Sequence, residues 1–116
     1  MAQIDNMFKN THRRDAYYDM INKHVPDALV CLHEDLVTYD FSSGVESLIK
    51  YNSPAIKISI DCDAVTYDVY ILFDSSYGVY AVGQDSLTGN FNSRTFNSAE
   101  EAIEELSKRL KQIILA

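Results

Sequence analysis

The segment between Ala55 and Cys62 places the strongest constraint on the fold, because its apolar residues recur at every second position. Successive side chains of a β-strand point to opposite faces, so this alternation is typical of a strand with one buried face. Three further segments rich in β-forming residues follow at short spacing and end at Phe96. Short links favour antiparallel pairing. We therefore predict an α+β fold with an antiparallel β-meander of about four strands over roughly residues 55–96.

The alternation also assigns the residues of the first two strands to two faces. We expect one face to pack in the core, with the residues Ile56, Ile58, Ile60, Cys62, Val65, Tyr67, Val69, Ile71 and Phe73. The opposite face carries Lys57, Ser59, Asp61, Asp63, Thr66, Asp68, Tyr70, Leu72 and Asp74. Packing explains the first face, so a functional surface is sought on the second.

Residues 99–115 predict a C-terminal helix that covers the sheet. Ser98 and Glu101 have the spacing of a capping box. The apolar residues that follow fall on one helical stripe. Acids early and bases late in the segment suit the helix dipole, and Glu105 and Arg109 are a favourable four-residue pair. Helix stability alone therefore explains the charge pattern of this segment.

Residues 1–54 predict mainly helical structure before the meander. Asn10 or Thr11 can cap a helix, and Pro26 is expected to end or interrupt it. Residues 27–41 suit either a helix or a hairpin, and the spacing of their leucines favours the helix.

A second capping box, formed by Ser43 and Glu46, predicts a short helix further along this part of the chain. Pro54 follows it and separates it from the first strand of the meander. We therefore expect helices before the sheet, with residues 27–41 as the segment that could form a hairpin instead.

Length and composition favour one domain over residues 1–116. The hydrophobic fraction of 47% and the charged fraction of 23% are ordinary for a folded globular protein. No apolar run approaches the roughly 18 to 20 residues of a membrane span, and the N-terminus has no signal-peptide core, so we expect a cytoplasmic protein. Cys31 and Cys62 do not indicate a disulfide framework and are expected to be buried thiols.

The acidic excess lies in the middle of the chain. Residues 1–23 contain three acids and four bases, residues 24–93 contain ten acids and two bases, and residues 94–116 contain four of each. This charge disfavours binding to nucleic-acid phosphates or to an anionic membrane and favours encounter with a basic surface. Solubility of a small protein is the alternative explanation of the same acidity.

The aspartates of the segment ISIDCDAV allow two chemical interpretations. The segment resembles the strand-end DxDx(T/V) motif of haloacid-dehalogenase-type phosphatases, which implies Asp61 as nucleophile and Asp63 as general acid/base. That family uses a parallel doubly wound sheet, which a meander does not provide. An EF-hand loop counted from Asp61 requires Gly and Glu where the chain has Thr66 and Leu72. We therefore expect no enzyme, metal or cofactor, and an enzyme that uses Asp61 and Asp63 is the alternative.

The predicted meander with its covering helix resembles, in topology, double-stranded-RNA-binding domains and integrase arm-binding domains. Both resemblances imply a basic surface, whereas residues 58–93 contain no Lys or Arg. Small acidic proteins that block a basic enzyme surface agree better with the size and charge of the chain. Phage anti-restriction and anti-CRISPR inhibitors and toxin-immunity proteins are of this kind.

We therefore expect an inhibitor or adaptor that presents Asp61, Asp68, Tyr70, Asp74 and Tyr80 to a basic protein partner. Tyrosine is enriched in protein interfaces, and acidic residues around it steer a basic partner. The carboxylates would imitate nucleic-acid phosphates, and we expect no direct nucleic-acid or membrane binding.

Two alternatives concern the same face of the sheet. The N-terminal helices could cover it too, which would make Tyr70, Leu72 and Val82 a second core layer. The face could also join two copies of the chain in a homodimer or larger homo-oligomer.

Overall fold

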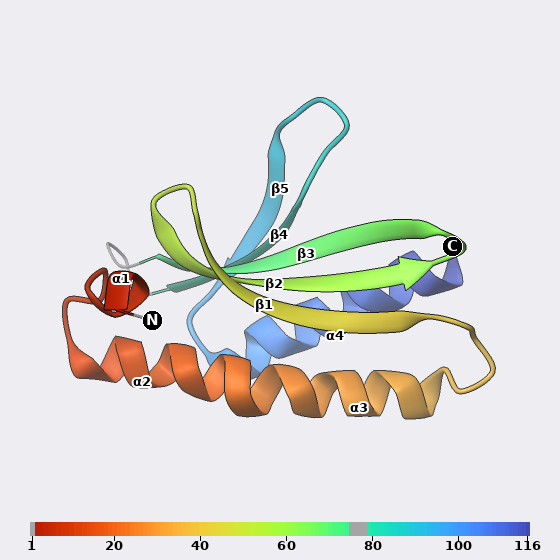
Figure 1. Cartoon of the computed structure of the whole chain (residues 1–116), viewed down its shortest axis with the longest axis horizontal. Coiled ribbons are helices and arrows are strands. Elements are labelled where there is room, and N and C mark those ends of the chain that lie inside the picture. The colour runs from red at the N-terminus through yellow and green to blue at the C-terminus, as the bar shows by residue number, and fades with distance from the viewer. Residues whose placement is uncertain (1, 75–78) are drawn as a thin grey trace.

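The computed structural model describes residues 2–74 and 79–116, with the side chains of residues 2, 3 and 74 left aside (Figure 1). The short link that follows the second predicted strand, just after Asp74, lies outside these residues. The elements are, in order, α1 (Ala2–Asp5), α2 (Thr11–Asp19), the π-helix η1 (Met20–His24), α3 (Val25–Asp35), β1 (Ser42–Lys50), β2 (Ser53–Cys62), β3 (Val65–Asp74), β4 (Val79–Asp85), β5 (Phe91–Phe96) and α4 (Ala99–Leu115).

The sheet has five antiparallel strands in the order β1-β2-β3-β4-β5, so each strand pairs with its neighbour in sequence. The long helix of α2, η1 and α3 lies on the same side of the sheet as α4 (Figure 1). The fully buried isoleucines of β2 belong there to the same hydrophobic core as Leu106 and Leu110 of α4. The predicted α+β fold is confirmed, with one strand more than expected.

The additional strand is β1, where the capping box of Ser43 and Glu46 predicted a helix. That prediction is wrong, because β1 pairs with β2 along its whole length, from Ser42 to Lys50. The two residues that join these strands, Tyr51 and Asn52, both have positive φ angles. This is the backbone of a type I′ turn, whose twist matches that of paired strands. Pairing with β2 therefore outweighs the local capping preference.

Pro26 does not end the first long helix, because α2, η1 and α3 follow one another without a break. Of the two predicted effects of Pro26, only an interruption is seen, where the π-helix η1 replaces the regular α-helix directly before it. In η1 the helix widens, and the N–H of Val25 donates to the carbonyl of Met20, five residues earlier. A proline in a regular helix lacks an N–H and its ring clashes with the carbonyl four residues before it. The wide turn directly before Pro26 relieves this conflict.

Helix α3 confirms the preference for a helix over a hairpin after Pro26, although it ends at Asp35. Its buried stripe runs through Val25, Leu29 and Leu32, at steps of four and three residues. Cys31 is not on this stripe and is exposed. The expectation of two buried thiols is therefore wrong for Cys31, while Cys62 is half-buried.

The pair of Glu105 and Arg109 on α4 is buried, where the sequence indicated an ordinary helix-surface pair. Each side chain has less than a tenth of its surface exposed, and Arg109 Nε lies 2.7 Å from Glu105 Oε2. Arg109 also donates to the side chain of Gln84 and to the carbonyl of Asn92. Because Arg109 donates to β4 and to β5 as well as to Glu105, the pair fastens α4 to both strands. These partners compensate for the burial of the two charges.

Among the described residues, no helix has both the length and the apolar character that crossing a membrane requires.

Tyr17 joins α2 to the sheet and should contribute measurably to stability. Its ring is fully buried, and its hydroxyl donates to the carbonyl of Ala55 at 2.8 Å and forms a hydrogen bond with Ser47 Oγ. Tyr17→Phe should lower the free energy of unfolding by about 1–2 kcal/mol, because a buried carbonyl loses a partner. Urea unfolding measures the change. Tyr39→Phe, at a residue 47% exposed, should change stability by less than about 0.5 kcal/mol; equal effects of the two changes would contradict this role.

Burial raises the pKa of Tyr17 above its usual value, and the hydrogen bond with Ser47 opposes the shift only in part. A raised pKa means that the unfolded chain loses this proton at lower pH than the folded chain. The contribution of Tyr17 is thus complete below about pH 10 and is lost as the pH rises through its folded pKa. As the pH is raised above about 10, the free energy of unfolding should therefore fall less steeply for Tyr17→Phe than for the natural chain. Parallel pH profiles would contradict the shift.

Candidate functional site

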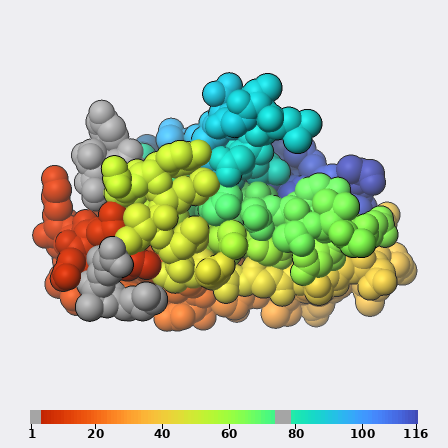
Figure 2. Space-filling view, turned by 45° about the horizontal axis from the view of Figure 1, so that its top comes forward, coloured from red at the N-terminus to blue at the C-terminus, as the bar shows by residue number. Residues whose placement is uncertain are grey.

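The candidate site is the side of the sheet away from the helices, which we call the open face. Strand register and alternation place these side chains on it: Ser42, Glu46, Leu48 and Lys50 of β1, Ala55, Lys57, Ser59 and Asp61 of β2, Thr66, Asp68, Tyr70 and Leu72 of β3, Ala81 and Asp85 of β4, and Phe91, Ser93 and Thr95 of β5. In Figure 2 the surface toward the viewer is largely yellow-green to cyan, the colours of the strands. The alternative in which helices cover this face is therefore wrong, and Val82 belongs to the other face, in the main core.

One end of the open face carries Asp61 and Asp68, whose hydrogen-bond partners are hydroxyl groups. Thr66 Oγ1 donates to Asp61 Oδ1 at 2.5 Å, and Ser59 Oγ donates to Asp68 Oδ1 at 2.7 Å. Ser42 Oγ lies 3.4 Å from the other oxygen of Asp61. These bonds fix the orientation of both carboxylates without neutralising them. We call this region the acidic end.

The two lysines of the open face are both in ion pairs with other carboxylates. Lys57 Nζ lies 3.0 Å from Glu46 Oε1, and Lys50 Nζ lies 3.1 Å from Asp85 Oδ2. The hydrogen bond and charge of Glu46 raise the pKa of Lys57, and the field of Asp68 adds to this shift. Among the described residues, the ion pairs found leave Asp61 and Asp68 without a cation. The acidic end therefore keeps its negative charge.

The other end of the open face is apolar and partly enclosed. Ala55, Tyr70 and Leu72 are buried there, and the half-buried residues Leu48, Ala81 and Phe91 pack against them. No helix of the described residues contributes to this small cluster. In Figure 1 the β1–β2 and β4–β5 hairpins rise on this side of the sheet. The strands of the coiled sheet therefore shelter this cluster. We call this region of the open face the apolar end.

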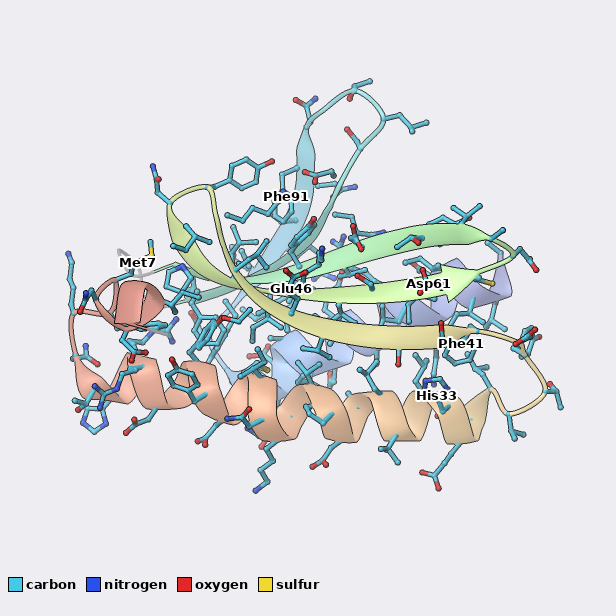
Figure 3. The ribbon with its side chains drawn as sticks, viewed as in Figure 1. Met7, His33, Phe41, Glu46, Asp61 and Phe91 are labelled. Carbon is cyan, nitrogen blue, oxygen red and sulfur yellow. The ribbon has the colours of Figure 1, made fainter. Side chains whose placement is uncertain are left out.

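The two edge strands approach each other across the apolar end. The rings of Tyr51, next to β1, and Phe91 of β5 have their centroids 5.4 Å apart. The ion pair of Lys50 and Asp85 joins the same two hairpins. Figure 3 labels Phe91, Glu46 and Asp61, which mark the apolar end, the middle and the acidic end of the open face.

The structure brings three of the five predicted site residues together. Asp61, Asp68 and Tyr70 lie on the open face, although the Tyr70 ring is 9% exposed and acts mainly in packing. Tyr80 does not lie there, because the pairing of Phe73 with Tyr80 puts both rings on the helix-covered face, 4.9 Å apart. The placement of Tyr80 is therefore corrected. The side chain of Asp74 lies outside the described part of the structure.

Four residues of the apolar end were missed by sequence reasoning: Lys50, Tyr51, Asp85 and Phe91. Assigning residues after Ser43 to a helix removed β1 from the sheet and with it the first two of these. The segment VESLIK does not alternate between apolar and polar residues, so its pattern gave no indication of a strand. Asn52, a residue type that tolerates a positive φ in a two-residue turn, was the local indication of the hairpin.

A polar cleft of about 240 Å³ opens where β3 and β4 separate beyond the pairing of Tyr70 with Gly83. Its lining consists of Thr66, Tyr67, Asp68, Tyr70, Gln84 and Asp85. Within residues 2–74 and 79–116, no three His, Cys, Asp or Glu side chains converge as a metal site would require. All strand pairs of the sheet are antiparallel, so the parallel frame implied by the phosphatase resemblance of Asp61 and Asp63 does not occur.

Comparison of the chain with protein-family models, with curated protein sequences and with solved structures found no match in any of the three.

The packing of the apolar end predicts opposite effects of alanine at two strand glycines. A Cβ at Gly83 would lie 2.6 Å from Ser93 Cβ and 2.7 Å from the Phe91 ring, whereas one at Gly44 would meet nothing within 4 Å. Gly83→Ala should therefore lower the free energy of unfolding by about 1–3 kcal/mol. Gly44→Ala should leave stability unchanged or raise it by about 0.5 kcal/mol. Urea unfolding of both variants tests this, and a tolerated Gly83→Ala would mean that Phe91 does not lie over Gly83.

Proposed function

We propose that this chain is a non-enzymatic binding protein, an inhibitor or adaptor, that uses its open face to contact a basic surface of another protein. The proposal rests on one observation above all: Asp61 and Asp68 are held in fixed orientations by hydroxyl groups and have no cation partner among the described residues. An unneutralised pair of this kind attracts a partner that brings its own Lys or Arg.

The charge of the whole chain also supports a basic partner. The net charge is −7, and the only Lys or Arg residues between positions 24 and 93 are Lys50 and Lys57, both in ion pairs with carboxylates of the open face. Such a field accelerates encounter with a basic protein and repels nucleic-acid phosphates. A natural partner is thus an enzyme or toxin with a basic, nucleic-acid-binding surface. The preorganised carboxylates would occupy the places of phosphates on it, as in anti-CRISPR-like or immunity proteins.

The shape of the open face adds to this proposal. Bare carboxylates in water contribute little binding energy because surface ion pairs are screened. At the apolar end, however, the side chains of Tyr51 and Phe91 lie next to Lys50 and Asp85, and Tyr51 is 58% exposed. Aromatic side chains at an interface provide the apolar contact area that charges lack. A protein partner would contact both the carboxylates of the acidic end and the aromatic side chains of the apolar end.

Charge-neutral variants at the acidic end test the proposal. The tagged chain is used to capture proteins from an extract of its source organism, at low and at high salt. Asp61→Asn with Asp68→Asn keeps acceptors for the hydroxyl groups but removes two charges. The purified partner should then bind about tenfold more weakly at low salt, with a smaller dependence on salt.

The matched control is Glu100→Gln with Glu104→Gln, which changes the net charge equally at exposed positions of α4. This variant should bind the partner as the natural chain does. Equal affinity of all three proteins, or affinity that does not change with salt, would overturn the proposal. Equal weakening by both double variants would assign the effect to net charge and not to the open face.

A further inference from the structure

The ammonium group of Lys50 lies inside an aromatic cage at the apolar end. Its Nζ is 4.3 Å from the ring centroid of Tyr70, 4.8 Å from that of Tyr51 and 5.9 Å from that of Phe91. Asp85 Oδ2 accepts a hydrogen bond from the same nitrogen at 3.1 Å. Three ring faces and a carboxylate thus surround one cation. Sites of this composition recognise alkylammonium groups, because ring quadrupoles and a fixed anion both favour a cation.

The walls of this cage hold one another without the help of Lys50. The ring of Phe91 contacts the ring of Tyr51 at 5.4 Å and that of Tyr70 at 6.2 Å, as measured between centroids. The hydroxyl of Tyr51 donates to Asp85 Oδ1 at 3.1 Å. Tyr51 lies in the turn between β1 and β2, Tyr70 in β3 and Phe91 in β5, so the paired backbone of the sheet also fixes their spacing. The cage is therefore preorganised, and removal of Lys50 should leave it in place.

The occupant, by contrast, is a flexible side chain at the end of a strand. Lys50 is the last residue of β1, and its side chain is 18% exposed. Desolvation lowers the pKa of Lys50, but the hydrogen bond to Asp85 and the nearby charges outweigh it and raise the pKa overall. Lys50 is thus an ammonium ion at neutral pH, and rotation about its side-chain bonds is enough to move it into water.

We propose that Tyr51, Tyr70, Phe91 and Asp85 form a binding site for a lysine ammonium of the basic partner, and that Lys50 fills this site in the free chain. This inference rests on the proposed function. A tethered side chain competes at an effective concentration of about the millimolar range. A partner lysine displaces Lys50 only when other contacts, such as those at the acidic end, hold the partner nearby. The cage would then favour a lysine over an arginine of the partner surface, because a compact ammonium fits it better than a planar guanidinium group.

Removal of the internal occupant tests the site directly. Lys50→Ala is titrated with tetramethylammonium chloride, and two-dimensional NMR spectra follow the ring signals of Tyr51 and Phe91. We expect saturable shifts in Lys50→Ala and binding at least about tenfold weaker in the natural chain, where Lys50 competes. Sodium chloride at equal concentration is the control for ionic strength. Lys50→Ala with Phe91→Leu removes one wall and should lose the binding.

A second measurement uses the natural chain, in case Lys50→Ala does not fold. Ring currents should shift the Cε protons of Lys50 upfield in the free protein, and added hexalysine should return them toward the position of an exposed lysine. A folded Lys50→Ala that binds no tetramethylammonium, or Lys50 signals that hexalysine leaves unchanged, would overturn the inference. If Asp61→Asn with Asp68→Asn weakens partner binding while the cage fails these two tests, the proposed function is retained and the lysine site alone is rejected.

Discussion

Burial of the isoleucines of β2 is the interaction on which the rest of the structure depends. Ile56, Ile58 and Ile60 are fully buried under the helices, and β2 pairs over nearly its full length with a strand on each side. Because alternate side chains point to opposite faces, this burial turns Asp61 away from the helices. A shift of one residue in register would exchange the two faces and expose the isoleucines. The position of the open face is thus a consequence of the main core.

The coil of the sheet then divides the open face into two unlike ends. Sheets twist with a fixed hand, and the twist here brings the edge strands β1 and β5 together over Tyr70. At that end, the rings leave only 18% of the Lys50 side chain exposed, and this partial desolvation strengthens the electrostatic attraction between Lys50 and Asp85. At the far end the strands carry hydroxyl groups beside Asp61, which stays hydrated. One sheet therefore offers a sheltered cation site and an open acidic surface without any additional domain.

Sequence periodicity was sufficient for the parts of the fold that local patterns determine, and it failed where distant pairing decides. β2, β3 and α4 follow from alternation and from a helical stripe with its cap at Ser98. β1 could not be predicted from Ser43 onward, because its strand conformation depends on pairing with β2. The face of Tyr80 depends on the register between β3 and β4, which alternation within one strand does not give. The meeting of Lys50 with Phe91 comes from the coil of the sheet, which has no local sequence pattern.

The distribution of partners among the charged groups explains why two ends are useful to a binding protein of the proposed kind. Asp61 and Asp68, with hydroxyl partners only, act over a distance of about one Debye length and so affect mainly the rate of encounter. A contact that persists needs desolvated interactions, because exposed ion pairs contribute little. On the described part of the open face, such interactions are available where rings surround the cation of Lys50. A site already occupied by an internal ammonium excludes single small cations. It admits only a partner that first docks on the acidic end, so the two ends together favour one extended basic surface over many small cations.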